Sequence, residues 1–177
     1  SNRAITLAPA APSGHLARAR AATVLGKYTE AAQGFSGALS GLRPVPAELV
    51  NEIMASLPSD ELRARAIPSR PDAIRTAAVT LLQQGRPTAA MAIATALQSR
   101  YPNVPASHAE AVRSSLANGQ PLLAELYARH MIDAFPKNPL SHLSLARALR
   151  AQRKLPQAVK TLSDALKTID TVPLRLL

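Results

Sequence analysis

The feature that most constrains the fold of this chain is a repetition with a period of 34 residues across 71–172. Glycine, proline and alanine return at equivalent positions one period apart. These equivalent residues are Gly85 and Gly119, then Pro102 and Pro136, and then Ala90, Ala124 and Ala158. A period of this length is typical of proteins in which one small structural unit stacks on the next.

The apolar residues within one period, 71–104, follow the spacing of an α-helix. Ile74, Ala78 and Leu81 fall on one helical face, as in an amphipathic helix. Gly85 can end this helix because glycine readily adopts a positive φ, and Pro87 can begin the next because the first helical turn needs no proline N–H. Each period is therefore predicted to be a helical hairpin. One hairpin is too small to bury its own apolar face, so neighbouring hairpins must stack.

The recurring residues resemble the tetratricopeptide repeat. The positions that carry the resemblance are Ala78, Val112 and Ala146, then Ala90, Ala124 and Ala158, and then Pro102 and Pro136. The resemblance implies an all-α fold, a right-handed superhelical α-solenoid of stacked antiparallel helix pairs, and a non-enzymatic role in protein–protein interaction. The chain departs from the family pattern because it lacks tryptophan, has few tyrosines and phenylalanines, and carries Asp170 where a proline is expected.

The register of the repeat divides the chain into segments. Complete repeats are predicted at 12–45, 71–104, 105–138 and 139–172. Residues 1–11 are interpreted as the tail of a preceding repeat or as a disordered stretch. Residues 173–177 are interpreted as the start of a following repeat, which suggests a fragment of a longer bacterial array.

Residues 46–70 interrupt the period. Their apolar spacing predicts one amphipathic helix around Leu49 and Ile53, and Ser59 is predicted to cap a second short helix at 61–66. Two interpretations stay open for this segment. It is either a degenerate, shortened helical pair that keeps the stack continuous, or an insertion that bends the superhelix or docks a partner.

The resemblance implies that the first helix of each pair lines a concave surface. The exposed positions of these helices alternate arginine with aliphatic residues, and they are the predicted partner-binding residues. They are Leu16, Arg20, Arg75, Val79, Leu82, Arg113, Leu116, Leu143, Arg147 and Arg150. Arginine can hold a carboxylate with two parallel hydrogen bonds, and aliphatic neighbours can bury apolar groups. We therefore expect a groove that captures an acidic protein or peptide segment.

The chain is strongly basic, with 21 lysines and arginines against 11 acidic residues and a net charge of +10. No acidic residue occurs between Asp133 and Asp164. This is either an ordinary solvated surface or a surface that attracts an anionic partner. The alternative function is direct binding of an anionic polymer, such as an acidic glycan, by the basic C-terminal repeats. Nucleic acid is disfavoured because few aromatic residues are available for base stacking.

The sequence contains no phosphate-binding loop, no metalloprotease motif, no nucleophile elbow and no cysteine, so no catalytic residue and no cofactor are predicted. His15, His108 and His142 share one repeat position and are predicted to pack rather than to bind a metal. No apolar run is long enough to span a membrane. A soluble segment is expected, with the bacterial periplasm and the cytoplasm both open, and envelope assembly or exopolysaccharide export is a conceivable setting.

Overall fold

A computed structural model describes residues 11–169, and within that range the chain forms ten helices and no strand. The helices are α2 (Pro12–Val24), α3 (Tyr28–Gly41), α4 (Ala47–Ser56), α5 (Asp60–Ala66), α6 (Pro71–Gln83), α7 (Pro87–Arg100), α8 (Pro105–Ala117), α9 (Pro121–Ala134), α10 (Pro139–Ala151) and α11 (Leu155–Ile169). The predicted segment 173–177, Asp170 and nearly all of 1–11 lie outside the described residues.

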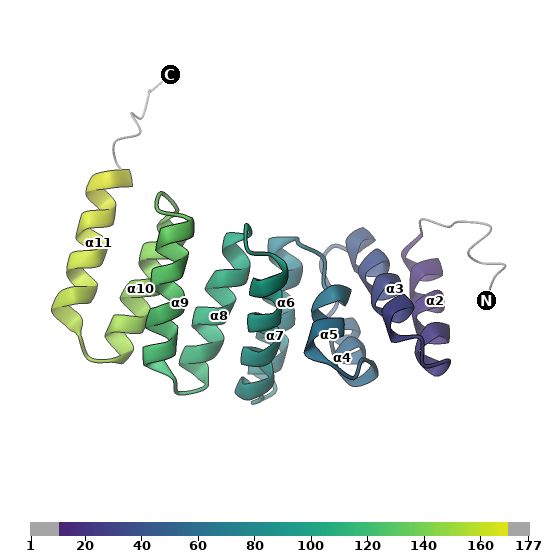
Figure 1. Ribbon diagram of the computed structural model, residues 1–177. Helices are drawn as coiled ribbons and strands as arrows, with labels where there is room; N and C mark the ends of the chain where they lie inside the picture. The colour runs from purple at the N-terminus through teal and green to yellow at the C-terminus, as the bar shows by residue number, and fades with distance from the viewer. Residues whose placement is uncertain (1–10, 170–177) are drawn as a thin grey trace, which may run out of the picture.

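Successive helices run antiparallel and stack side by side into an elongated array, with α2 at one end and α11 at the other (Figure 1). From α6 onward, α6, α8 and α10 form one layer in which α8 packs against both α6 and α10, and α7, α9 and α11 alternate with them. The predicted α-solenoid of stacked antiparallel helix pairs is confirmed.

Positive φ angles end the first helix in four hairpins. Gly26, Gly85 and Gly119 have φ values of 70°, 67° and 71°, as expected for residues that follow a helix. The fourth equivalent position is occupied by Arg153, which adopts a φ of 61° although it carries a side chain. Three of these turns therefore have glycine, which adopts a positive φ without strain, whereas the turn at Arg153 is strained.

The segment 46–70 forms α4 and α5, which lie within the array between α3 and α6 (Figure 1). The Ser59 side chain accepts a hydrogen bond from the Leu62 N–H at 3.3 Å, so the predicted N-cap is confirmed. After α5, the Arg70 guanidinium donates hydrogen bonds to the carbonyls of Leu39, Ser40 and Leu42. Arg70 thus satisfies carbonyl groups at the C-terminal end of α3 that the helix leaves open.

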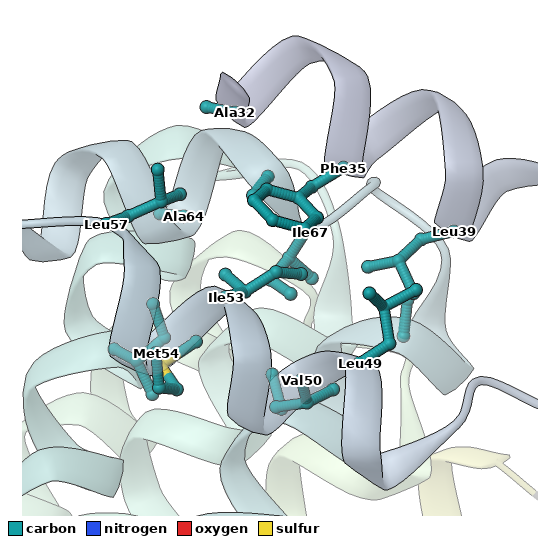
Figure 2. Close-up of a cluster of buried hydrophobic side chains, with 14 of the residues drawn as sticks. Ala32, Phe35, Leu39, Leu49, Val50, Ile53, Met54, Leu57, Ala64 and Ile67 are labelled. Atoms are coloured by element: carbon teal, nitrogen blue, oxygen red, sulfur yellow. The ribbon is translucent and has the colours of Figure 1, made fainter. Parts of the chain in front are cut away.

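The N-terminal part of the array has a large apolar core. Phe35 and Leu39 of α3, together with Ile53 and Ile67, are fully buried and point toward one another (Figure 2). This cluster extends through buried residues from α2 to α7. Its aliphatic and aromatic side chains provide the dominant favourable term in folding.

The first helices of the C-terminal part bury polar side chains instead. Those on α8 and α10 are Ser107, His108, Glu110, Ser114, Ser115, Ser141 and Ser144. A smaller apolar cluster, built around Leu145 and Leu149, accompanies them. The two ends of the array are therefore stabilised by different kinds of contact.

Two pairs of adjacent polar residues, one period apart, tie neighbouring hairpins together. The Ser107 and Ser141 hydroxyls donate to the carbonyls of Tyr101 (2.8 Å) and Phe135 (2.9 Å). The Nε2 atoms of His108 and His142 lie 2.8 Å from the carbonyls of Pro102 and Pro136. We call these the Ser–His pairs; they confirm that His108 and His142 have structural packing roles.

Candidate partner-binding pocket around α8

A pocket of about 580 Å³ opens on the layer formed by α6, α8 and α10. We call it the α8 pocket. It is lined by Pro71, Asp72, Arg75, Ala106, Ala109, Glu110, Val112, Arg113, Leu116, Leu140, Leu143, Ser144 and Arg147. Five predicted partner-binding residues meet here, because they lie on three helices that pack side by side: Arg75, Arg113, Leu116, Leu143 and Arg147.

The other five predicted residues lie outside the α8 pocket. Leu16 and Leu82 are half-buried and pack against the N-terminal core, while Val79 is half-buried on α6. Arg20 is exposed and donates to both carboxylate oxygens of Glu52, at 2.7 and 2.8 Å. Arg150 is exposed near the end of α10. The structure therefore does not gather all ten residues into one continuous site.

The pairing of Arg20 with Glu52 joins α2 to α4. The hydrogen bonds from Arg20 hold the pKa of the Glu52 carboxyl below its usual range. A guanidinium already engaged by two oxygens of its own chain is less available to a partner than a free one. The sequence could not show this pairing because Glu52 belongs to the segment that interrupts the period.

Glu110 is a buried acid that the sequence analysis did not single out. Its side chain is 7% exposed and forms an ion pair with Arg113, one turn further along α8. Burial raises the pKa of Glu110 and outweighs the opposite effects of Arg113 and Arg75. The sequence does offer one sign that this position is unusual. The equivalent residues in the flanking repeats, Thr76 and Ser144, are uncharged.

Arg75 and Arg147 are the more available cations of the α8 pocket. Both are exposed, and within 11–169 neither makes a hydrogen bond or an ion pair with a side chain. Arg113 is partly buried, and its Nε atom has no hydrogen-bond partner among the described residues. Three guanidinium groups thus border one cavity, although Glu110 already engages one of them.

The second acidic residue of the α8 pocket, Asp72, is neutralised by an arginine next to the pocket. Asp72 pairs with Arg70, and the hydrogen bond from Arg70 lowers the pKa of the Asp72 carboxyl. The apolar part of the lining comes mainly from Leu116, Leu140 and Leu143. The pocket can therefore receive an anionic group beside an aliphatic one.

Within the described residues, no group of three or more histidine, cysteine, aspartate or glutamate side chains is arranged to hold a metal ion. Nor does any helix between Pro12 and Ile169 combine the length and apolar character needed to cross a membrane. His15 lies against α3, where a side chain at Gly37 would overlap its ring.

Comparison with known proteins agrees with this architecture. The family model of the tetratricopeptide repeat matches residues 109–173. Residues 109–173 carry tetratricopeptide repeats. This region includes most of α8 and all of α10, so it provides much of the lining of the α8 pocket. No curated protein matches the chain in sequence.

One solved structure has the same fold. The crystal structure of MamA protein aligns with a TM-score of 0.55 and 13% identity, and the alignment covers 94% of this chain and 97% of that chain. A structure described as MamA MSR-1 C2 aligns with a TM-score of 0.49 and 13% identity, covering 90% of this chain and 97% of that chain. At this identity, the likeness to the first of these structures shows the fold alone.

Proposed function

We propose that this chain is a non-enzymatic scaffold that captures an acidic segment of a partner protein in the α8 pocket. Tetratricopeptide repeats are typical of protein-interaction scaffolds, which supports the general role. The observation that supports the location is the meeting of Arg75, Arg113 and Arg147 with leucine side chains around one cavity.

The chemistry of the lining favours a particular kind of segment. A guanidinium group matches a carboxylate because both are planar and can form two parallel hydrogen bonds. The leucines beside the arginines would bury an aliphatic side chain of the same segment. The preferred partner would therefore alternate acidic and aliphatic residues, and it could lie across α6, α8 and α10.

A synthetic probe can test this proposal. The probe is a fluorescein-labelled peptide of alternating leucine and glutamate residues, and its matched control replaces every glutamate with glutamine. Fluorescence anisotropy should show that the acidic peptide binds and that the glutamine peptide binds at least about tenfold more weakly, since charge-assisted hydrogen bonds are lost. Equal affinities for the two peptides would contradict the proposal.

Variants then locate the binding site. Arg147→Ala should weaken binding of the acidic peptide because Arg147 is exposed and has no competing pair. Arg18→Ala is the matched control, since it removes an exposed arginine from α2 at the other end of the array. If both variants bind equally well, the α8 pocket is not the site.

Arg113→Ala is a less direct test. Removing Arg113 would leave the carboxylate of Glu110 buried without its ion-pair partner, and such a loss destabilises a protein by about 3–5 kcal/mol. A binding defect in that variant would therefore mix lost recognition with lost stability. Arg75→Ala is a better second variant because Arg75 is exposed.

The alternative function, binding of an acidic glycan, has its own supporting observation. Lys137, Arg150, Arg153 and Lys160 are exposed, and within 11–169 none makes an ion pair. Such a surface would suit the acidic polymers of a bacterial envelope, so envelope assembly or exopolysaccharide export is the setting that this alternative favours. Binding of a polyuronate should then fall steeply with added salt, whereas capture of the leucine–glutamate peptide should depend less on salt.

A further inference from the structure

The α8 pocket contains an acidic group that the proposed function does not use. Glu110 lies among the lining residues, yet a negative charge there opposes the capture of an acidic segment. Burying a carboxylate also costs free energy, because it gives up its hydration. An uncharged residue would avoid both effects, as Thr76 and Ser144 do at the equivalent positions.

The charged groups around Glu110 come from three helices. On α8 itself, Arg113 forms the ion pair. From α6, Arg75 lies close enough to act on Glu110 electrostatically, and Asp72 is neutralised by Arg70. From α10, Arg147 lines the same pocket. The lining includes no residue of α7 or α9, the other two helices that pack on α8.

We propose that Glu110 is a built-in competitor that occupies Arg113 in the free protein and must release it when a partner carboxylate binds. This inference rests on the proposed function, because it concerns the same pocket. In the free protein, the charge of Glu110 balances part of the arginine cluster. In the complex, the partner carboxylate and Glu110 compete for the Arg113 guanidinium group, so Glu110 lowers the affinity.

The competition makes capture sensitive to acid. A protonated Glu110 no longer attracts Arg113, which becomes free to bind the partner. The raised pKa of Glu110 agrees with this direction, because the carboxyl gains its proton at a higher pH than an ordinary glutamate does. Affinity for a permanently charged partner should therefore increase as the pH falls.

The first experiment compares Glu110→Gln with the unaltered protein, using the leucine–glutamate peptide and fluorescence anisotropy. Glu110→Gln should bind the peptide about tenfold more tightly, since a competing charged hydrogen bond is removed. Glu48→Gln is the matched control, because Glu48 is an exposed acid on α4, and its affinity should stay within about twofold. Unchanged or weaker binding by Glu110→Gln would overturn the inference.

The second experiment needs no variant and remains decisive if Glu110→Gln fails to fold. It uses a peptide of alternating leucine and cysteic acid, whose sulfonates stay ionised throughout the titration. As the pH is lowered from about 7.5 toward the ordinary pKa of glutamate, affinity for the unaltered protein should rise about tenfold. An affinity independent of pH would overturn the inference.

The outcomes separate this inference from the function on which it rests. If neither acidic peptide binds the unaltered protein, the proposed function fails and the competition fails with it. If both peptides bind and Arg147→Ala weakens them, but neither Glu110→Gln nor pH alters the affinity, only the competition fails. If affinity depends on pH in the unaltered protein but not in Glu110→Gln, the result supports both the proposed function and the competition.

Discussion

The two parts of the solenoid, α2 to α7 and α8 to α11, have the same helical plan but bury different side chains. The N-terminal part buries phenylalanine, isoleucine and leucine in one extended cluster. The C-terminal part buries five serines, a histidine and a glutamate on α8 and α10. Because apolar burial drives stacking, the N-terminal part should contribute more stability, while the C-terminal part carries the α8 pocket.

The contrast is clear at single repeat positions. Phe35 is equivalent to Ala94, Ala128 and Leu162 of later hairpins, so the first hairpin has an aromatic ring where two later ones have only a methyl group. In the opposite sense, the fully buried Ser115 lies one period from Leu81 and from Leu149. The repeat fixes the backbone path, and individual positions then distribute stability and polarity along it.

The largest expected effect comes from removing the aromatic ring of the apolar part. Phe35→Ala should lower the free energy of unfolding by about 3–5 kcal/mol, because a fully buried phenylalanine leaves a cavity. Urea denaturation followed by circular dichroism measures the change. A loss below about 1 kcal/mol would mean that the N-terminal core is not the main source of stability.

The next effect concerns acid stability of the polar part. Hydrogen bonds from Arg129 and Gln152, together with Lys154, lower the pKa of Glu125 from 4.5 to about 2. Because the folded pKa is depressed, the stabilisation from Glu125 is fully present above pH 4.5 and disappears as the pH falls toward about 2. Glu110, with its raised pKa, contributes stability in the opposite direction, at low pH.

Unfolding of Glu125→Gln should therefore depend less on pH across that window than unfolding of the unaltered protein. Glu48→Gln serves as the control, since Glu48 is exposed on α4. Thermal melts at a series of pH values provide the measurement. Identical acid profiles for the two variants would show that the Glu125 ion pairs do not hold α9 to the hairpin that follows it.

A smaller effect, of opposite sign, should come from Ser114. Its hydroxyl is fully buried and has no hydrogen-bond partner among the described residues. Ser114→Ala should raise the free energy of unfolding by about 1–2 kcal/mol because it removes an unsatisfied polar group. Alanine already occupies the equivalent buried position at Ala148, so the substitution fits the repeat.

Ser115→Ala is the matched control for Ser114→Ala. The Ser115 hydroxyl donates to the Ala111 carbonyl at 2.8 Å. Removing it therefore costs a hydrogen bond, whereas removing the Ser114 hydroxyl costs none. We expect no stabilisation from that variant. A comparable gain from both substitutions would show that buried serines in general, rather than the unpaired one, weaken α8.

The smallest effect concerns the strained turn before α11. Arg153→Gly should raise the free energy of unfolding by about 0.5 kcal/mol, because relief of the left-handed strain exceeds the entropy cost of glycine. Gly119→Ala, at the equivalent turn, should be destabilising. Differential scanning calorimetry can resolve both changes, and a destabilised Arg153→Gly would contradict the strain.

Sequence reasoning predicted the features that depend on local rules. Glycine conformation, the Ser59 cap and helical periodicity are local, and the structure confirms them. Five of the predicted partner-binding residues also meet in the α8 pocket, because the repeat sets which helices lie side by side. Their role in capture stays a prediction.

Features that depend on contacts between distant residues were not predictable in this way. Glu110 could be seen as an acid on a helix, but its burial depends on how α6 and α10 close over α8. The pairing of Arg20 with Glu52 depends on how α4, which lies outside the repeat, is turned toward α2. Arg70 binds carbonyls about thirty residues earlier in the chain, a contact with no sequence signature.

The Ser–His pairs have a mechanical consequence. Each pair fastens the loop that closes one hairpin to the helix that opens the next, at Ser107–His108 and again at Ser141–His142. The corresponding residues of α6 are Ala73 and Ile74, which offer no such bond. If the array were pulled from its two ends, the joints at Ser107–His108 and Ser141–His142 should therefore resist separation and keep the three arginines of the pocket at a constant spacing.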